Sequence, residues 1–220
     1  MTSPIHLDES PIRLERLRQS LPEWLKRFLP SGGGQAHDHH GKGMFGFTVF
    51  LLSESIIFIS FFVSYIALRL TTEHWLPPGI KGPELSTSVI VHSVVLLSSS
   101  LVIQWAERAL KRRKLNQFRL LWLLTSAMGA YFLVGEVQEW LGLDFGVSAG
   151  LVGGTFYLLT GFHGLHVLTG IILQLLMLAR SFIPGNYKKS HFGVSATTLF
   201  WHFVDGIWVI LFSLLYLWRA

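Results

Sequence analysis

The residues of this chain that could carry acid–base chemistry lie inside long apolar runs. His163 and His166 stand near the middle of residues 151–179, a run that contains no Asp, Glu, Lys or Arg. Glu54 interrupts a second run, and Asp205 lies in a third. A charged side chain at mid-bilayer costs roughly 2.5–3.5 kcal/mol on insertion scales. Each of these groups should therefore be neutral or paired, and the chemistry open to them is to hold or exchange a proton.

The two histidines are one helical turn apart and share a helix face. Such an H-x-x-H pair could ligate a metal or haem iron, with His92 and His202 as further ligands, but the pattern alone is a weak signal. We favour structural hydrogen bonding for His163 and His166. Three small residues beside the pair would let a neighbouring helix approach closely: Gly161, Gly164 and Gly170.

The other deep polar residues leave two interpretations open. Glu54 could hold or exchange a proton, or it could be a neutral acid that hydrogen-bonds across helices. His202 and Asp205 are one turn apart and could pair with each other or with a neighbouring helix, and a proton relay is the alternative. Glu54, His163 and Asp205 fall near mid-depth, which permits a shared polar layer.

Two further groups lie nearer the ends of the apolar runs. Glu136 and Glu139 are one turn apart close to the membrane interface, where ionisation costs less, and we expect outer-surface hydrogen-bonding groups there. His37, His39 and His40 resemble a metal-binding tract. For this tract we favour a solvated linker.

Five apolar runs must position these residues. About 20 apolar residues suffice to cross a bilayer, so the sequence predicts an all-α polytopic membrane protein, a bundle of five transmembrane helices. The spans are expected at about 44–70, 85–106, 118–140, 151–179 and 195–218. Residues 44–220 would form the membrane domain. Residues 1–43 would form an amphipathic, flexible N-terminal tail, with leucines and basic residues at a spacing that suits a membrane surface.

Charge and composition narrow the class further. The chain has 220 residues and no cysteine, which excludes disulfides and thiolate chemistry. The net charge of +5 is the excess of 18 Lys and Arg over 13 Asp and Glu. Most of the Lys and Arg residues fall in the tail and in the second and fourth connections. This pattern indicates topology rather than a nucleic-acid partner, and it predicts a cytoplasmic N-terminus.

Several motifs carry a family resemblance. Gly161-Phe-His-Gly-Leu-His166 and Phe200-Trp-His-Phe-Val-Asp205 together resemble the signature of subunit III of haem-copper terminal oxidases. Leu52-Ser-Glu-Ser55 resembles the first conserved helix of that family, whose glutamate matches Glu54. The resemblance covers about residues 42–220 and is to the five-span bacterial form, which lacks the first two helices of mitochondrial-type members.

The resemblance implies a non-catalytic subunit of a proton-pumping oxidase, which reduces oxygen to water with electrons from cytochrome c. In that family, subunits I and II hold the haem and copper. Subunit III has no redox cofactor, packs against subunit I, binds phospholipid, and supports assembly and proton uptake. Its glutamate, here Glu54, is the carbodiimide-reactive carboxyl group. The expected location is a bacterial plasma membrane or an internal energy-transducing membrane.

Three alternatives remain at this level. The first is subunit III of a quinol oxidase, because Glu136 stands where many family members have glutamine, a pattern also seen in quinol-oxidising relatives. A small proton-coupled transporter could use Glu54, His163, His166 and Asp205 as its relay, although no repeat is visible in the sequence. A metal- or haem-binding redox protein is the third alternative.

Overall fold

The computed structural model describes residues 39–183, 187 and 191–218. The chain divides into two compact units, Met1–Gly46 and Phe47–Ala220. Nearly all described residues belong to the second unit. The amphipathic segment expected in the N-terminal tail lies outside the described residues.

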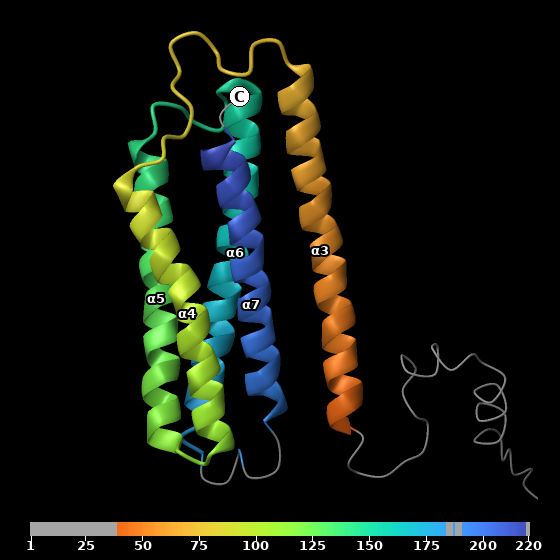
Figure 1. The fold of residues 1–220 in the computed structure, drawn as a ribbon, viewed down its shortest axis with the longest axis vertical. Coiled ribbons are helices and arrows are strands. Elements are labelled where there is room, and N and C mark those ends of the chain that lie inside the picture. The colour runs from red at the N-terminus through yellow and green to blue at the C-terminus, as the bar shows by residue number, and fades with distance from the viewer. Residues whose placement is uncertain (1–38, 184–186, 188–190, 219–220) are drawn as a thin grey trace, which may run out of the picture. The chain divides into compact units, whose positions relative to one another are not determined.

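The described residues form helices joined by turns and loops, without a strand. All five long helices are long and apolar enough to cross a membrane, which confirms the prediction of an all-α protein with five spans. They pass alternately up and down along one axis (Figure 1), and a single π-helical turn follows the last. The elements are α3 (His39–Thr71), α4 (Thr87–Lys111), α5 (Leu115–Gly142), α6 (Gly150–Arg180), α7 (Phe192–Phe212) and η1 (Ser213–Leu217).

Helix α4 shows why the helices extend beyond the expected spans. We expected its span to end near Ala106, the last residue of the apolar run, but the helix continues to Lys111. Backbone hydrogen bonding does not require apolar side chains, so a helix can continue into the headgroup region with charged residues on its surface. The helix closes with two capping bonds, from the Lys114 amide to the Ala109 carbonyl (2.9 Å) and from the Arg113 amide to the Leu110 carbonyl (2.8 Å). Arg113 adopts the left-handed conformation (φ 61°) that this type of cap requires.

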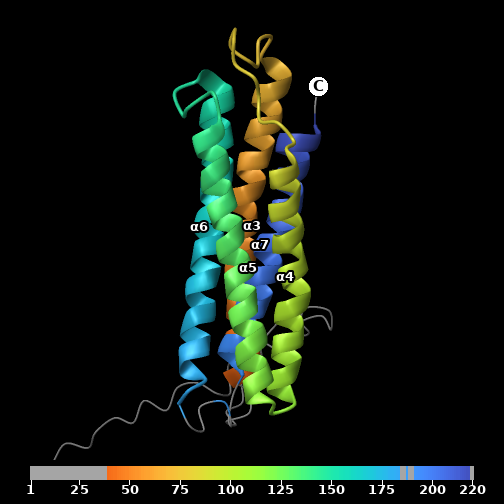
Figure 2. The same ribbon diagram turned by 90° about the vertical axis from the view of Figure 1, so that its left-hand side faces the viewer.

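Trp201 of α7 joins the four helices α4 to α7. Its ring is fully buried, and a Cβ atom placed on Gly129 of α5 or Gly170 of α6 would approach that ring to 2.6 or 2.7 Å. The indole nitrogen donates a hydrogen bond to Ser99 Oγ of α4 at 2.8 Å. The two glycines therefore make the space that lets one large side chain contact three neighbouring helices. Figure 2 shows α4 and α5 nearest the viewer, with α7 behind them.

Helix α3 is joined to α6 and α7 mainly by aromatic side chains. The fully buried Phe58 packs its ring 5.0 Å from Phe162 and 6.1 Å from Phe203, between ring centroids. Near the other end of α3, Arg69 donates hydrogen bonds to the Tyr65 hydroxyl and to the Trp218 carbonyl, both at 2.8 Å. These contacts fix the face of α3 that carries Glu54.

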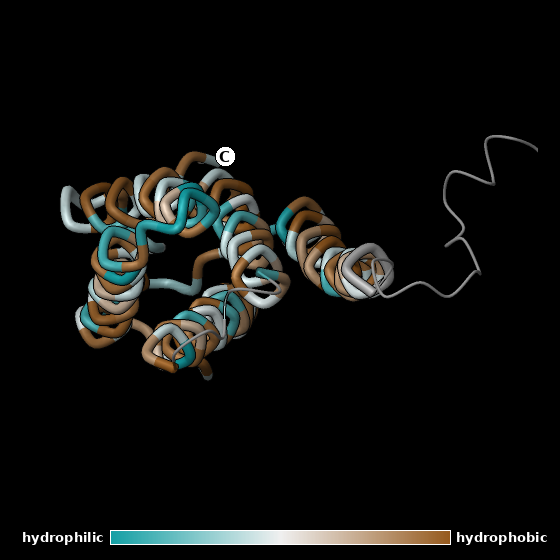
Figure 3. Tube along the Cα trace, turned by 90° about the horizontal axis from the view of Figure 1, so that it is seen from below, coloured by the Kyte–Doolittle hydropathy of each residue, from teal (hydrophilic) through white to brown (hydrophobic). Residues whose placement is uncertain are grey.

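The outer surface of the helices is apolar. Many leucine, isoleucine and valine side chains on all five helices are exposed, among them Leu52, Leu120 and Leu165. Viewed along the helices, hydrophobic segments lie on the outward faces as well as the inward ones (Figure 3). Such a surface is stable in contact with lipid, so apolar side chains need not be buried within the protein. Only a minority of the side chains are buried, and many of these are polar.

Candidate functional site

Glu54 and His166 form a pair between α3 and α6. Glu54 Oε2 lies 3.2 Å from His166 Nε2, and both side chains are largely buried. The other ring nitrogen, Nδ1, lies 2.8 Å from the Phe162 carbonyl oxygen. A carbonyl oxygen can only accept, so Nδ1 carries a hydrogen. Nε2 of the neutral ring is therefore an acceptor. A hydrogen bond between Nε2 and Glu54 Oε2 then requires one additional proton, carried by either Glu54 or His166.

That single proton gives the pair no net charge. Either a protonated Glu54 donates to a neutral imidazole, or an imidazolium donates to a carboxylate. The pair lies among aromatic rings, with the Phe58 and Phe162 centroids 5.0 and 4.7 Å from that of His166. In such surroundings an unshared charge would be strongly disfavoured. The arrangement can hold a proton inside the membrane without a counter-ion.

His163 has a different environment from His166, although the two are one turn apart. It is fully buried, with its ring stacked on Trp208 at 5.0 Å and edge-to-face with Phe132 at 5.9 Å. Neither ring nitrogen has a hydrogen-bond partner among the described protein groups. The shared polar layer that the sequence permitted does not form as such, because Glu54 bonds His166 rather than His163.

Asp205 and His202 connect α7 to α4 through Ser100. The Ser100 hydroxyl donates to Asp205 Oδ2 and lies 2.9 Å from His202 Nδ1. His202 Nε2 also contacts Gln104 Oε1 at 3.1 Å. Of the alternatives for His202 and Asp205, contact with the neighbouring helix is the one present. The serine run in α4 supplies the bridging hydroxyl.

Glu136 and Glu139 differ in burial. Glu139 accepts a hydrogen bond from the Tyr216 hydroxyl at 2.7 Å. Glu136 is only 6% exposed, so it lies in the interior rather than at the outer surface where we expected it. The reason is that Gly164 has no side chain: a Cβ atom there would come within 2.9 Å of Glu136 Oε2. The glycine makes room for the carboxyl group between α5 and α6.

His92, like Glu136, occupies space that a glycine on a neighbouring helix leaves free. Its ring packs against Tyr131 at 4.7 Å and lies where a Cβ atom on Gly135 would be. Its Nδ1 is 3.3 Å from Ser88 Oγ on the same helix. His92 therefore fills the space between α4 and α5 and does not approach His163 as a fellow ligand.

The histidines do not converge with acidic residues into a three-ligand metal site in the part of the chain that the structure describes. Within residues 39–183, 187 and 191–218, no group of three His, Asp or Glu side chains is placed to hold a metal ion. His37 lies outside the described residues, as do the side chains of His39 and His40, so the histidine tract remains an untested expectation.

Sequence reasoning missed several polar contacts between helices. Gln174 is fully buried in α6 and accepts a hydrogen bond from Ser126 of α5 at 2.8 Å. Glu107 of α4 accepts one from Ser195 of α7 at 2.6 Å. Gln174 could have been identified from the sequence, because it is a polar residue within an apolar run. For Glu107, the expected end of the span at Ala106 hid the contact.

We expect Glu54→Gln to preserve assembly of the protein, whereas Glu54→Leu should reduce it. The glutamine amide can donate to His166 Nε2, but leucine leaves that buried nitrogen without a partner, which costs about 1–3 kcal/mol. The measurement is the amount of each variant in the membrane and its thermal midpoint after extraction. Equal damage by Gln and Leu would mean that the charged form of Glu54 is required for folding.

The geometry thus defines a class: a multi-pass membrane protein whose buried polar side chains mainly bond its helices to one another. Comparison with known sequences identifies the family. A model of the family described as cytochrome c oxidase subunit III matches residues 23–220. The chain belongs to the cytochrome c oxidase subunit III family.

Individual relatives agree with that family. The chain is 43% identical to cytochrome c oxidase subunit 3 of Synechocystis sp. over 188 residues, which cover 84% of this chain and 80% of the relative. It is also 43% identical to the protein of the same name from Thermostichus vulcanus, over 83% of this chain and 90% of the relative. Identity to the Mus musculus protein is 32%, over 90% and 79% of the two chains. As expected from the motifs, the chain is an accessory subunit of a haem-copper oxidase and an integral membrane protein.

Proposed function

We propose that this subunit packs against subunits I and II of a cytochrome c oxidase and leaves the redox chemistry to them. In this proposal, subunits I and II hold the haem and copper, and the complex reduces oxygen to water with electrons from cytochrome c. The relatives are all named cytochrome c oxidase subunit 3, and this name supports cytochrome c as the electron donor. The structural observation that carries the proposal is the use of Glu54, Asp205 and Glu139 as hydrogen-bonding partners between helices.

The Glu54–His166 pair gives the subunit a defined proton environment. Because it holds one proton without net charge, it is stable in the membrane and could still exchange that proton. A protonated carboxyl group is also the form that carbodiimides attack. We assign to this pair the buried reactive acid expected from the family resemblance, and to the other polar residues the role of packing contacts.

The orientation of the subunit follows from its basic residues. The α4–α5 turn, the last residues of α6 and the first residues of α7 lie at the same end of the helices (Figure 1). This end carries Arg108, Lys111, Arg112, Arg113 and Lys114. By the positive-inside rule it faces the cytoplasm, in a bacterial plasma membrane or an internal energy-transducing membrane. The exposed apolar faces of the helices would contact subunit I and bound phospholipid.

Purification through an affinity tag on this chain in mild detergent tests the proposal. We expect subunits with haem and copper spectra to co-purify in stoichiometric amounts, and the tagged polypeptide, once separated from them, to be colourless. A pigmented isolated chain, or one that transports protons unaided in liposomes, would contradict the proposal and favour the redox-protein or transporter alternative.

A further inference from the structure

The tip of the α4–α5 hairpin carries a set of exposed cations that we call the hairpin basic patch: Arg108, Arg112, Arg113 and Lys114. Among the described residues, none of the four takes part in an ion pair. The nearest acid in sequence, Glu107, is buried and already bonded to Lys111 at 2.8 Å and to Ser195 at 2.6 Å. The sequence has no Asp or Glu from residue 108 to residue 135. Within the part of the chain that the structure describes, no carboxylate therefore neutralises the patch by a direct ion pair.

The patch continues from an apolar, lipid-facing surface. Trp105 is 53% exposed and lies on the same face of α4 as Arg108 and Arg112, three and seven residues further on. On α5, Leu120 is 68% exposed just beyond the turn. Tryptophan is enriched where hydrocarbon meets headgroups. Along this surface, apolar side chains give way to an indole and then to cations, which is the order of acyl chain, interface and phosphate in a phospholipid.

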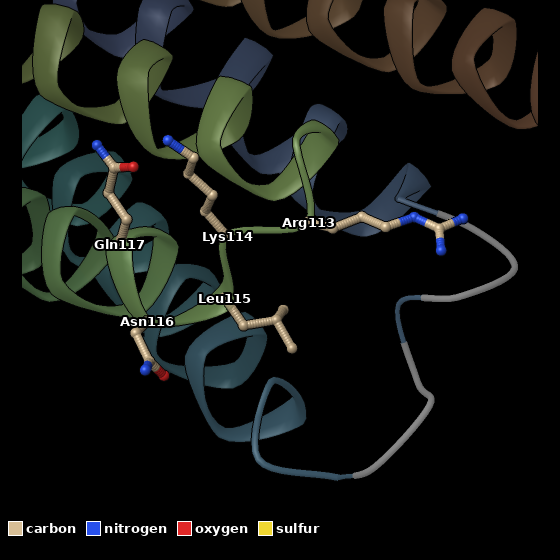
Figure 4. A pocket seen from close by; sticks show the side chains of 5 residues that line it. All are labelled: Arg113, Lys114, Leu115, Asn116 and Gln117. Atoms are coloured by element: carbon tan, nitrogen blue, oxygen red, sulfur yellow. The ribbon is translucent and has the colours of Figure 1, made fainter.

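Arg113 at the turn adds a second observation. Its φ of 61° lies in the left-handed region, at a helix-capping position where glycine is the usual residue. An arginine there has a backbone strain that glycine would avoid, which favours a role for the side chain. Figure 4 shows Arg113 and Lys114 extending from the turn in different directions, beside a shallow hollow lined by residues 113–117. The cations thus spread over an area rather than converging on one small ion.

We propose that the hairpin basic patch binds the phosphate headgroups of anionic phospholipid. The inference rests on the lipid contact proposed above and adds the headgroup class and the place. Charge complementarity selects an anionic lipid over a zwitterionic one, and the adjoining exposed apolar faces of α4 and α5 accommodate its acyl chains. Each Lys or Arg near an anionic lipid surface contributes about 1 kcal/mol.

The test uses the assembled oxidase, purified through this chain, delipidated and titrated separately with phosphatidylglycerol and phosphatidylcholine. Bound lipid per complex is counted by mass spectrometry. The variant is Arg112→Gln with Arg113→Gly, in which glycine suits the turn conformation and the fold is retained. We expect phosphatidylglycerol affinity to fall about five-fold per cation removed, the equivalent of about 1 kcal/mol each, with phosphatidylcholine unaffected.

Lys81→Gln is the matched control, because it removes an exposed cation from the α3–α4 loop at the opposite end. It should leave phosphatidylglycerol binding at the wild-type level. Unchanged phosphatidylglycerol affinity in the double variant would overturn the inference, as would an equal loss of phosphatidylcholine. Loss of a partner subunit with lipid binding intact would also overturn it, by identifying an acidic protein surface as the occupant. Co-purification of the haem subunit tests the proposed function separately.

Discussion

Replacing Trp201 with alanine should lower the free energy of unfolding of this subunit by about 3 kcal/mol, at the lower end of the range for buried tryptophan. The indole contacts Gly129 and Gly170 on two helices and bonds Ser99 on a third. Lipid is as apolar as the protein interior, so the loss comes from packing and from the hydrogen bond rather than from transfer out of water. The midpoint of SDS-induced unfolding of the subunit within the purified complex measures the effect.

Trp105→Ala serves as the control for Trp201→Ala. Trp105 is also on a helix facing the membrane but is 53% exposed. Its loss should shift the midpoint by only a fraction of the Trp201→Ala effect. Similar shifts for the two variants would show that Trp201 is not the residue that joins α4, α5, α6 and α7.

Gly164→Leu should have the second largest effect and lower the free energy of unfolding of the subunit by about 1–3 kcal/mol. A Cβ atom on this residue would lie 2.9 Å from Glu136 Oε2, and the remaining leucine atoms would push the buried carboxyl group out of its space between α5 and α6. Gly164→Ala should have a smaller effect of the same sign. The yield of assembled complex and the same unfolding midpoint report both variants.

Gly206→Leu is the matched control on α7, because a Cβ atom there would meet nothing within 4 Å. It makes the same change of residue in a helix of the same membrane domain and should leave the yield near that of the unsubstituted protein. If Gly164→Leu assembled as well as Gly206→Leu, the close packing of α5 on α6 at Glu136 would be wrong.

The number and type of elements could be predicted from the sequence because bilayer thickness fixes the length of an apolar helix. Helix ends were less predictable. The apolar run ends at Ala106, but the hydrogen-bonded helix ends at Lys111 with a cap that involves the left-handed Arg113. Such a cap is normally signalled by glycine, and its absence left no local mark in the sequence.

The candidate site was predictable residue by residue but not as pairs. Depth in the apolar runs identified Glu54, His166 and Asp205 as residues that need partners. Which partner each one takes depends on helix rotation and neighbour order, and one helical turn separates His163, among aromatic rings, from His166, bonded to Glu54. The sequence shows where glycines and serines allow close contact between helices, but it does not show which side chain fills the space. Trp201, which packs against Gly170, lies on another helix.

The most direct test of a role outside the redox chemistry is the initial rate of oxygen consumption per haem by the purified complex carrying Glu54→Gln and Asp205→Asn. Both amides keep a hydrogen-bonding group at the contacts with His166 and Ser100. Since we place the chemistry in the partner subunits, the initial rate should stay within about two-fold of the unsubstituted complex. Loss of a general acid–base group typically slows a reaction about 10²–10⁴-fold. A fall of that size in a fully assembled complex would contradict the account.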